Sequence, residues 1–260
     1  MDTPRKHVQL EVKDHVARVR LDRPPVNALN HDLVAELTEL AGSIQQNGDI
    51  WIVALRASGH VFCAGADLKE RAVLTQSEVI QAVKNIQDMV VAWIEVPQPV
   101  LAAVHGAALG GGLELVLAAD IIVASEAAKL GFPEVSLGII PAATGTQRLA
   151  QRTTLGVANK WVLSGSSFNA LEALADGVVD YIFPDAGFEQ EFERIVSQVA
   201  ACAPIALRQA KRAMSAIPWQ ALRSGLQTET DCYAQLVPTD DRAEALRAFA
   251  EKRKPIWRGK

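Results

Sequence analysis

The sequence repeats one local pattern, in which a short apolar run leads through a glycine-containing loop toward helix-forming sequence. Residues 50–56 (IWIVALR) have the length and composition of a buried strand; the loop SGHVFCAG and a helix near Ser77–Ile94 follow. Pro99–Val104 (PVLAAV) is a second such run, followed by the loop HGAALGG, a helix at Gly112–Ala118 and a strand at Asp120–Ala124. Strands that alternate with helices are typical of the α/β class, which the pattern therefore predicts.

The two ends of the chain depart from this repeat. At the N-terminus a short tail leads into HVQLEV and VARVRL, whose alternation predicts two antiparallel strands, and DRPPVNALN then precedes an amphipathic helix at about 31–46. After about Gly187 the strand pattern disappears, and we expect helices near Phe188–Ala200, Pro204–Ala213, Trp219–Leu236 and Asp240–Lys252. No Ser/Gly-rich linker precedes these helices, so we expect them to pack against the rest of the protein. We place the boundary between an α/β core and a helical region at residues 1–190 and 191–260.

Composition narrows the class of protein. A chain of 260 residues with 49% hydrophobic content can bury a large core as one domain with at most a small appendage. The longest uncharged run, Val96–Leu113, contains two prolines and four glycines, so we interpret it as strand plus loop and expect no membrane span. The absence of a leader pattern and three scattered cysteines predict a cytoplasmic protein with free thiols and no metal site. A net charge of -4 argues against nucleic acid as the main partner.

Two glycine-containing segments share one feature. CAGADL at 63–68 and LGGGLEL at 109–115 each follow a buried strand and begin a helix. The first N–H groups of a helix have no intrahelical acceptor and lie at the positive end of its dipole, so they favour a negatively charged ligand oxygen. Two such helix starts could form an oxyanion hole. Each segment alone could instead serve a tight turn or a nucleotide phosphate, although neither G-x-G-x-x-G nor the P-loop pattern occurs at either place.

Taken together, the motifs of the chain resemble those of the crotonase superfamily, and most closely those of the enoyl-CoA hydratases. The resemblance extends over nearly the whole chain through the segments PPVNALN, FCAGADLKE, HGAALGGGLELVLAADIIVA, AKLGFPEVSLGIIP, GTQRL and AFAEKRKPIW. It implies a spiral of repeated strand-strand-helix (ββα) units that carries the active site, and a C-terminal helical region that covers coenzyme A and takes part in oligomerisation. It further implies a homotrimer or homohexamer.

The resemblance also implies the roles of individual residues. The two oxyanion-hole amides correspond to Ala66 and Gly111, and the two catalytic glutamates to Glu114 and Glu134. Glu134 is then expected to protonate C2 of the substrate, while Glu114 orients and deprotonates a water molecule, with one of the two protonated at rest. The residues expected near coenzyme A are Ala64, Asp67, Leu68, Phe249 and Lys252.

The implied activity is hydration of a 2-trans-enoyl-CoA thioester without a metal or a separate cofactor. An enoyl-CoA isomerase, which needs only one proton-shuttling carboxylate, is the nearest alternative, and an RNA-binding role is a second alternative that the charge balance disfavours. One departure affects substrate choice, because Ala142 and Thr144 stand where related hydratases commonly have glycine. The added Cβ atoms could alter the acyl pocket, so chain length and branching stay open. We expect Cys63 to pack in the core, Asp67 to act also as a helix-start charge, and His105 to be structural.

Overall fold

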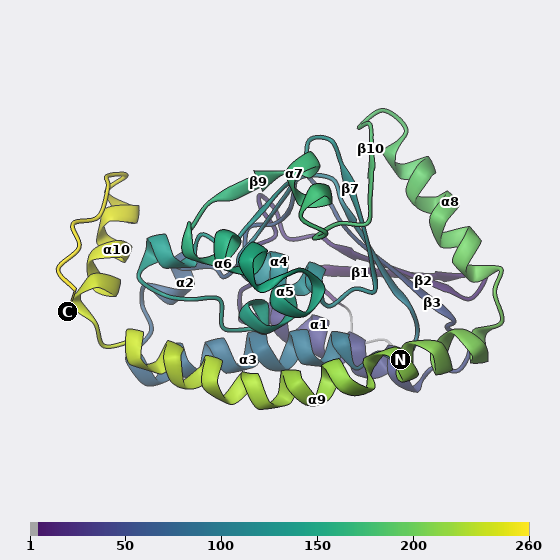
Figure 1. Cartoon of the computed structure of the whole chain (residues 1–260), viewed down its shortest axis with the longest axis horizontal. Coiled ribbons are helices and arrows are strands. Elements are labelled where there is room, and N and C mark those ends of the chain that lie inside the picture. The colour runs from purple at the N-terminus through teal and green to yellow at the C-terminus, as the bar shows by residue number, and fades with distance from the viewer. Residues whose placement is uncertain (1–4, 260) are drawn as a thin grey trace.

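Two β-sheets of unequal size form the centre of the fold (Figure 1). The structure, a computed structural model, describes residues 5–259 and, within the long C-terminal helix, the backbone alone of residues 217–219; the expected tail at residues 1–4 lies outside the described residues. The strands of the larger sheet, in spatial order, are β1 (Val8–Lys13), β2 (Val16–Leu21), β3 (Ile52–Ala57), β5 (Val100–Val104), β7 (Ile121–Ser125) and β10 (Tyr181–Phe183). Those of the smaller sheet are β4 (Val61–Cys63), β6 (Ala107–Leu109), β8 (Lys129–Gly131) and β9 (Ser167–Asn169).

Consecutive strands of the chain divide between the two sheets. β3, β5 and β7 lie side by side and parallel in the larger sheet, while β4, β6 and β8, which follow them directly, lie parallel in the smaller one. Each strand pair is therefore displaced by one strand from the pair before it, and the chain advances as a spiral of strand-strand-helix units. This confirms the predicted α/β spiral. Because β4 pairs with β6 in parallel, the two glycine-containing loops that follow these strands leave the same edge of the smaller sheet.

Helices cover the sheets, and their starts follow local capping rules. The helices of the core are α1 (His31–Gln46), α2 (Leu68–Arg71), α3 (Gln76–Ile94), α4 (Gly111–Leu117), the 3₁₀-helix η1 (Glu134–Leu137), α5 (Gly145–Arg152), α6 (Leu155–Leu163) and α7 (Ala170–Ala175). Asn30 caps α1 through Leu33 N–H, and Thr75 and Glu78 form a capping box at the start of α3. Apolar residues at helical spacing then bury one face of each of these helices, and Trp93 of α3 is fully buried.

Three expectations about the elements need correction. The two helices expected at 204–213 and 219–236 form one helix, α9 (Pro204–Leu236). The residues between them show only a weak helical pattern in the sequence, and packing of the buried residues of α9 against the core stabilises the continuous helix. The segments SGHVFCAG and HGAALGG, expected as loops, contain β4 and β6, because strands of three residues give no readable alternation. The helices α5, α6 and α7 were missed as well, although Thr154 and Asn169 provide N-caps for two of them.

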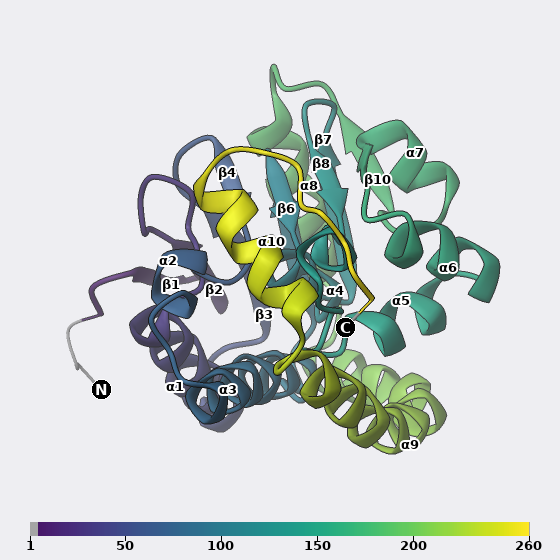
Figure 2. The same ribbon diagram turned by 90° about the vertical axis from the view of Figure 1, so that its left-hand side faces the viewer.

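The C-terminal helices return to the core. The helix α8 (Phe188–Ala200) packs on the larger sheet, α9 lies along α3 and α5, and α10 (Asp240–Ala250) lies at the end of the molecule that also carries α2 (Figures 1 and 2). Gly138, at the end of η1, lies so close to α10 that a Cβ atom there would stand 3.0 Å from the Arg242 Cα. The helices after Gly187 thus pack on the rest of the chain, as expected. No helix in the described part of the chain is long and apolar enough to cross a membrane.

Candidate active site

Two backbone N–H groups at the same edge of the smaller sheet are free to bind a ligand. Ala66 lies just before α2 and Gly111 is the first residue of α4; within residues 5–259 neither N–H donates to a protein acceptor. The loops that carry them touch, because a Cβ atom at Gly65 would stand 3.4 Å from the Gly111 nitrogen. The structure therefore places the two predicted donors on adjacent loops.

Glu114 lies in the first turn of α4 and is buried. Its Oε1 accepts hydrogen bonds from Ala143 N–H (2.7 Å) and Gly145 N–H (2.9 Å), in the loop before α5. Burial raises the pKa of Glu114 well above its ordinary value, and the nearby carboxylates of Glu229 and then Glu134 raise it further. The two backbone donors act in the opposite direction, because they stabilise the ionised form.

Glu134 begins η1, directly after β8 and Pro133, and its carboxylate faces the start of α4. A Cβ atom at Gly110 would stand 2.5 Å from Glu134 Oε1, so the absence of a side chain at Gly110, whose φ is 52°, makes room for this carboxylate. Glu134 Oε2 is buried and has no hydrogen-bond partner among the described residues. Burial raises the pKa of Glu134 to about 8. At neutral pH this group therefore carries a proton that it can donate.

One pocket joins these groups. It is lined by Ala64, Gly65, Ala66, Leu68, Arg71, Val83, Ile86, Gly110, Gly111, Glu114, Pro133, Glu134, Leu137, Ile139, Ile140, Ala142, Ala143 and Tyr233. Most of these side chains are apolar, which suits an acyl chain. Arg71 is the one cation among these lining residues. It is 8% exposed, its Nη1 donates to the Tyr233 hydroxyl (3.2 Å), and no carboxylate of residues 5–259 lies within ion-pair distance.

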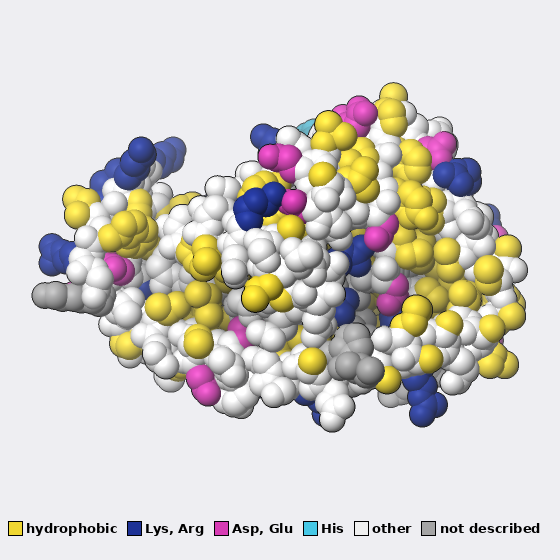
Figure 3. All heavy atoms as spheres, in the orientation of Figure 1, with side chains coloured by type: hydrophobic (Ala, Val, Ile, Leu, Met, Phe, Trp, Pro, Cys, Tyr) yellow, Lys and Arg dark blue, Asp and Glu magenta, His cyan; other side chains and the backbone are white. Residues whose placement is uncertain are grey.

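Most of the predicted site residues line the pocket, but not all of them do. Those that line it are Ala64, Ala66, Leu68, Gly111, Glu114 and Glu134. Asp67 instead caps α2 through its side chain and pairs with Arg23 at 2.8 Å, as expected for a helix-start charge. Phe249 and Lys252 lie exposed at the end of α10, where Lys and Arg side chains gather at the upper left of Figure 3. The roles of these three residues near coenzyme A stay predictions.

Two further positions bear on the sequence-based expectations. Ala142 lines the pocket, whereas Thr144 does not; Thr144 is buried with φ at 84°, and its N–H donates to Glu229 Oε1 at 2.8 Å. Sequence reasoning does not find Glu229, because an acidic residue on a long helix with only a weak apolar face gives no sign of burial. It is 3% exposed, and burial raises its pKa. The site therefore contains three buried carboxylates rather than two.

The contacts of Cys63 and His105 indicate structural roles for both residues. Cys63 is buried, which raises the pKa of its thiol to about 12, so it packs as a small apolar side chain as expected. The ring Nε2 of His105 lies 3.0 Å from the Gly59 carbonyl oxygen, which agrees with a structural role. No group of three or more His, Cys, Asp or Glu within the described part of the chain is arranged to hold a metal ion.

Free backbone donors beside two buried carboxylates are groups that can perform acid–base chemistry on a carbonyl compound. Comparison with known proteins gives the family. The family model for enoyl-CoA hydratase/isomerase matches residues 11–260. YngF of Bacillus subtilis (strain 168) is 41% identical over 248 residues, 95% of each chain. The mitochondrial methylglutaconyl-CoA hydratase of Homo sapiens is 37% identical over 239 residues, 90% of this chain and 70% of that one.

A solved structure supports the same assignment. The enoyl-CoA hydratase of Bacillus anthracis superposes with a TM-score of 0.80 at 38% identity, covering 98% of this chain and 100% of that one. The chain therefore belongs to the enoyl-CoA hydratase/isomerase family of the crotonase superfamily, whose members act on acyl-CoA thioesters.

Proposed function

We propose that the protein is an enoyl-CoA hydratase, which adds water across the C2–C3 double bond of a 2-trans-enoyl-CoA and catalyses the reverse dehydration. The observation that carries this proposal is that two buried carboxylates, Glu114 and Glu134, line one pocket that two free backbone N–H groups also line. Water addition needs a base for the water, an acid for C2 and stabilisation of the enolate oxygen. The four groups supply these three functions.

The geometry suggests how the steps are divided. Glu114 accepts two backbone N–H groups, which oppose the rise in its pKa, and in its ionised form it takes a proton from water as the water oxygen bonds to C3. The electron pair of the double bond moves toward the thioester oxygen, which the N–H groups of Ala66 and Gly111 hold. Glu134, with a pKa of about 8, then gives its proton to C2. These steps need no metal and no redox cofactor.

The experiment that tests this proposal is a parallel assay of the purified protein with a 2-trans-enoyl-CoA and a 3-enoyl-CoA. Hydration is measured as loss of the absorbance of the conjugated thioester, and isomerisation as its appearance. We expect hydration to dominate, because two carboxylates face the pocket where one would be enough to move a double bond. A protein that isomerises the 3-enoyl-CoA and hydrates nothing would contradict the proposal.

A specific observation favours one class of substrate, an enoyl-CoA whose acyl chain ends in a carboxylate. Arg71 is a buried cation on the wall of a mostly apolar pocket, and buried charges in proteins are normally paired. A substrate carboxylate would provide the missing partner, and the Tyr233 hydroxyl, bonded to Arg71 Nη1, would be a second donor. The human relative at 37% identity is named for methylglutaconyl-CoA, which supports this choice.

Replacement of Arg71 tests the substrate class. We expect Arg71→Met to lower kcat/KM for glutaconyl-CoA by about 100-fold, on the scale of a lost charged hydrogen bond, and to change kcat/KM for crotonyl-CoA by less than about threefold. Lys69→Met is the matched control, because Lys69 is exposed on the same short helix and loses the same charge. Equal losses for both substrates would show that Arg71 supports the site in general and does not select carboxylates.

The C-terminal region has a proposed role in assembly. We propose that residues 191–260 cover coenzyme A and contribute to a homotrimer or homohexamer, since several large apolar side chains of this region are exposed in the single chain (Ile205, Met214, Phe249, Ile256 and Trp257). Sedimentation measurements on the intact protein test the assembly.

A further inference from the structure

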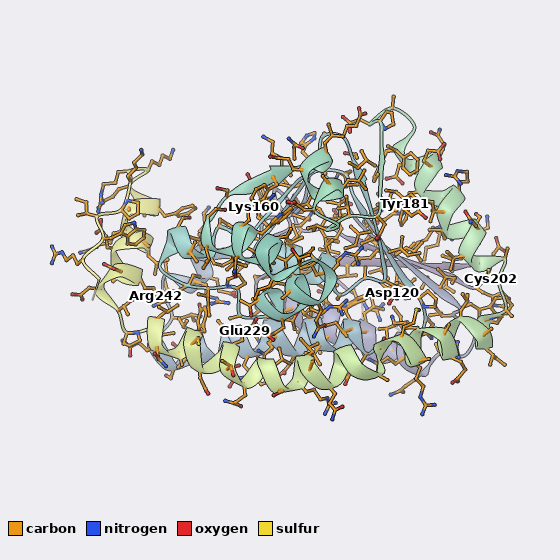
Figure 4. All side chains as sticks on the ribbon, in the orientation of Figure 1. Asp120, Lys160, Tyr181, Cys202, Glu229 and Arg242 are labelled. Carbon is orange, nitrogen blue, oxygen red and sulfur yellow. The ribbon has the colours of Figure 1, made fainter. Side chains whose placement is uncertain are left out.

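A third buried carboxylate lies behind the proposed acid–base pair. Glu229 projects from α9 toward the body of the molecule (Figure 4) and is 3% exposed. It lines no part of the pocket, so it does not face the substrate. Burial of an ionisable group is unfavourable, and its hydrogen-bond partners therefore indicate what it does.

Glu229 and Glu114 bind the same loop from two sides. The N–H groups of Ala143 and Gly145 donate to Glu114 Oε1, at 2.7 and 2.9 Å. Those of Thr144 and Thr146 donate to Glu229, at 2.8 Å to Oε1 and 3.2 Å to Oε2, and the Thr146 hydroxyl donates to Oε2 as well. Four consecutive backbone N–H groups thus alternate between two carboxylates from different helices. A change in the contact with Glu229 must rotate the peptide units that hold Glu114.

The surrounding packing keeps Glu229 in place. The helix α9 carries Gly225 one turn before Glu229, and a Cβ atom at that position would overlap the Gln147 side chain of α5, so the two helices meet closely there. On the third side, Gln87 of α3 donates from Nε2 to the Ala142 carbonyl oxygen at 3.2 Å. The loop is therefore held from α3, α4 and α9, and only the last of these contacts comes from the C-terminal region.

We propose that Glu229 is a positioning residue for the hydration reaction: it holds the N–H groups of Thr144 and Thr146 and thereby directs those of Ala143 and Gly145 to the carboxylate that activates water. The inference rests on the proposed function, because it gives Glu114 the part of the base. It extends that function to the C-terminal helical region, which supplies no predicted catalytic group.

The charge of Glu229 has a second effect on the base. Besides burial, Glu229 and then Glu134 raise the pKa of Glu114. Among the described residues, the other elements packed around these carboxylates contribute no charge at hydrogen-bond distance: α3 presents Gln87, α5 presents Thr146, and Arg148 of α5 donates to the Leu117 carbonyl oxygen. Arg71 and Tyr233 lie on the same pocket and donate nothing to the three glutamates. Removal of the charge of Glu229 should therefore let Glu114 ionise at lower pH.

The test is Glu229→Gln, with Asp231→Asn as a control that makes the same charge change on an exposed side chain of the same helix. We expect Glu229→Gln to lower kcat for hydration about tenfold, with KM within about twofold of wild type, because misplacement of a catalytic group affects the transition state more than binding. The acidic limb of the kcat–pH profile should move to lower pH. Asp231→Asn should change neither property.

Three results would overturn the inference: an unchanged kcat and pH profile in folded Glu229→Gln, a rise in KM alone, or equal effects of the control. If Glu229→Gln does not fold, Thr146→Val removes one of the three donors at nearly constant volume, and we expect about a threefold loss of kcat. An unchanged kcat in Thr146→Val would also overturn the inference.

Infrared titration of the glutamate carboxyls separates this inference from the proposed function. Even in a protein that hydrates nothing, Glu229→Gln should shift the Glu114 titration, and an unchanged titration would contradict the inference.

Discussion

The surroundings of Glu114 and Glu134 differ although both carboxylates face one pocket. Glu114 lies on a helix and accepts two backbone hydrogen bonds at one oxygen, whereas Glu134 follows a turn at Pro133 and leaves Oε2 without a partner in the described residues. Burial raises the pKa of both carboxylates, and backbone donors oppose that rise. Two carboxylates of the same residue type therefore have different surroundings in one pocket, because a second loop supplies donors to Glu114, and the proposed roles of base and acid rest on this difference.

The largest expected effect comes from removing either carboxylate. Glu114→Gln and Glu134→Gln should each lower hydration by at least about 100-fold, the usual scale for loss of a general acid or base. The double variant should lose far less than the product of the two, because the groups act in one step. Rates of the folded variants with a 2-trans-enoyl-CoA check this prediction. If Glu114→Gln is nearly harmless while Glu134→Gln abolishes activity, a single carboxylate does the chemistry and the reaction is an isomerisation.

The pH dependence of kcat for hydration should show the pKa of the proposed proton donor, Glu134. In the proposed reaction Glu134 acts as the acid and must be protonated, and its pKa of about 8 lies above the ordinary value of 4.5. We therefore expect kcat for hydration to fall as the pH rises through about 8, by about tenfold for each further pH unit. A kcat that stays constant to about pH 10 would show that Glu134 is not the proton donor.

A side chain at Gly110 should disturb Glu134 more than Glu114. The Cβ atom of Gly110→Ala would stand 2.5 Å from Glu134 Oε1, so the carboxylate must move, and we expect about a tenfold loss of kcat. Gly177→Ala is the matched control: Gly177 also has positive φ, 76°, but nothing lies within 4 Å of its added Cβ. It should reproduce the backbone strain without the loss of activity. Similar losses in both variants would attribute the effect to strain alone.

The smallest expected effect is on stability. The folded-state pKa of Glu134 is raised, so its contribution to the free energy of unfolding is fully present below the unfolded pKa of about 4.5 and is lost as the pH rises through about 8. Glu134→Gln should therefore unfold at higher urea concentration than wild type at about pH 9, and this advantage should shrink toward about pH 5. Urea denaturation at the two pH values measures it. An advantage that grows toward acid pH would contradict the raised pKa.

Much of the α/β core could be predicted because its elements are long and strongly patterned. The helix at Gln76–Ile94 and the buried strand at Val100–Val104 differ from expectation by one residue at their first position. The smaller sheet could not be predicted, because its strands have three residues each and exist only as partners of one another. The burial of Glu229 and Arg71 could not be predicted either, because it depends on residues more than 80 positions away in the chain. Thr144 contacts Glu229, and Tyr233 contacts Arg71.

The local chemistry of this protein follows from the order of residues in the chain. The glycine-containing segments before α2 and at the start of α4 carry N–H groups without intrahelical acceptors, and Glu114 stands one turn into α4. Only the folded chain brings backbone donors from the loop before α5 to Glu114, leaves Arg71 without an ion-pair partner among the described residues, and lets a glutamate of α9 hold the loop before α5. The physical reason is that hydrogen bonds within a helix or turn follow from neighbours in the chain, whereas burial and charge are set by segments that meet only when the chain has folded.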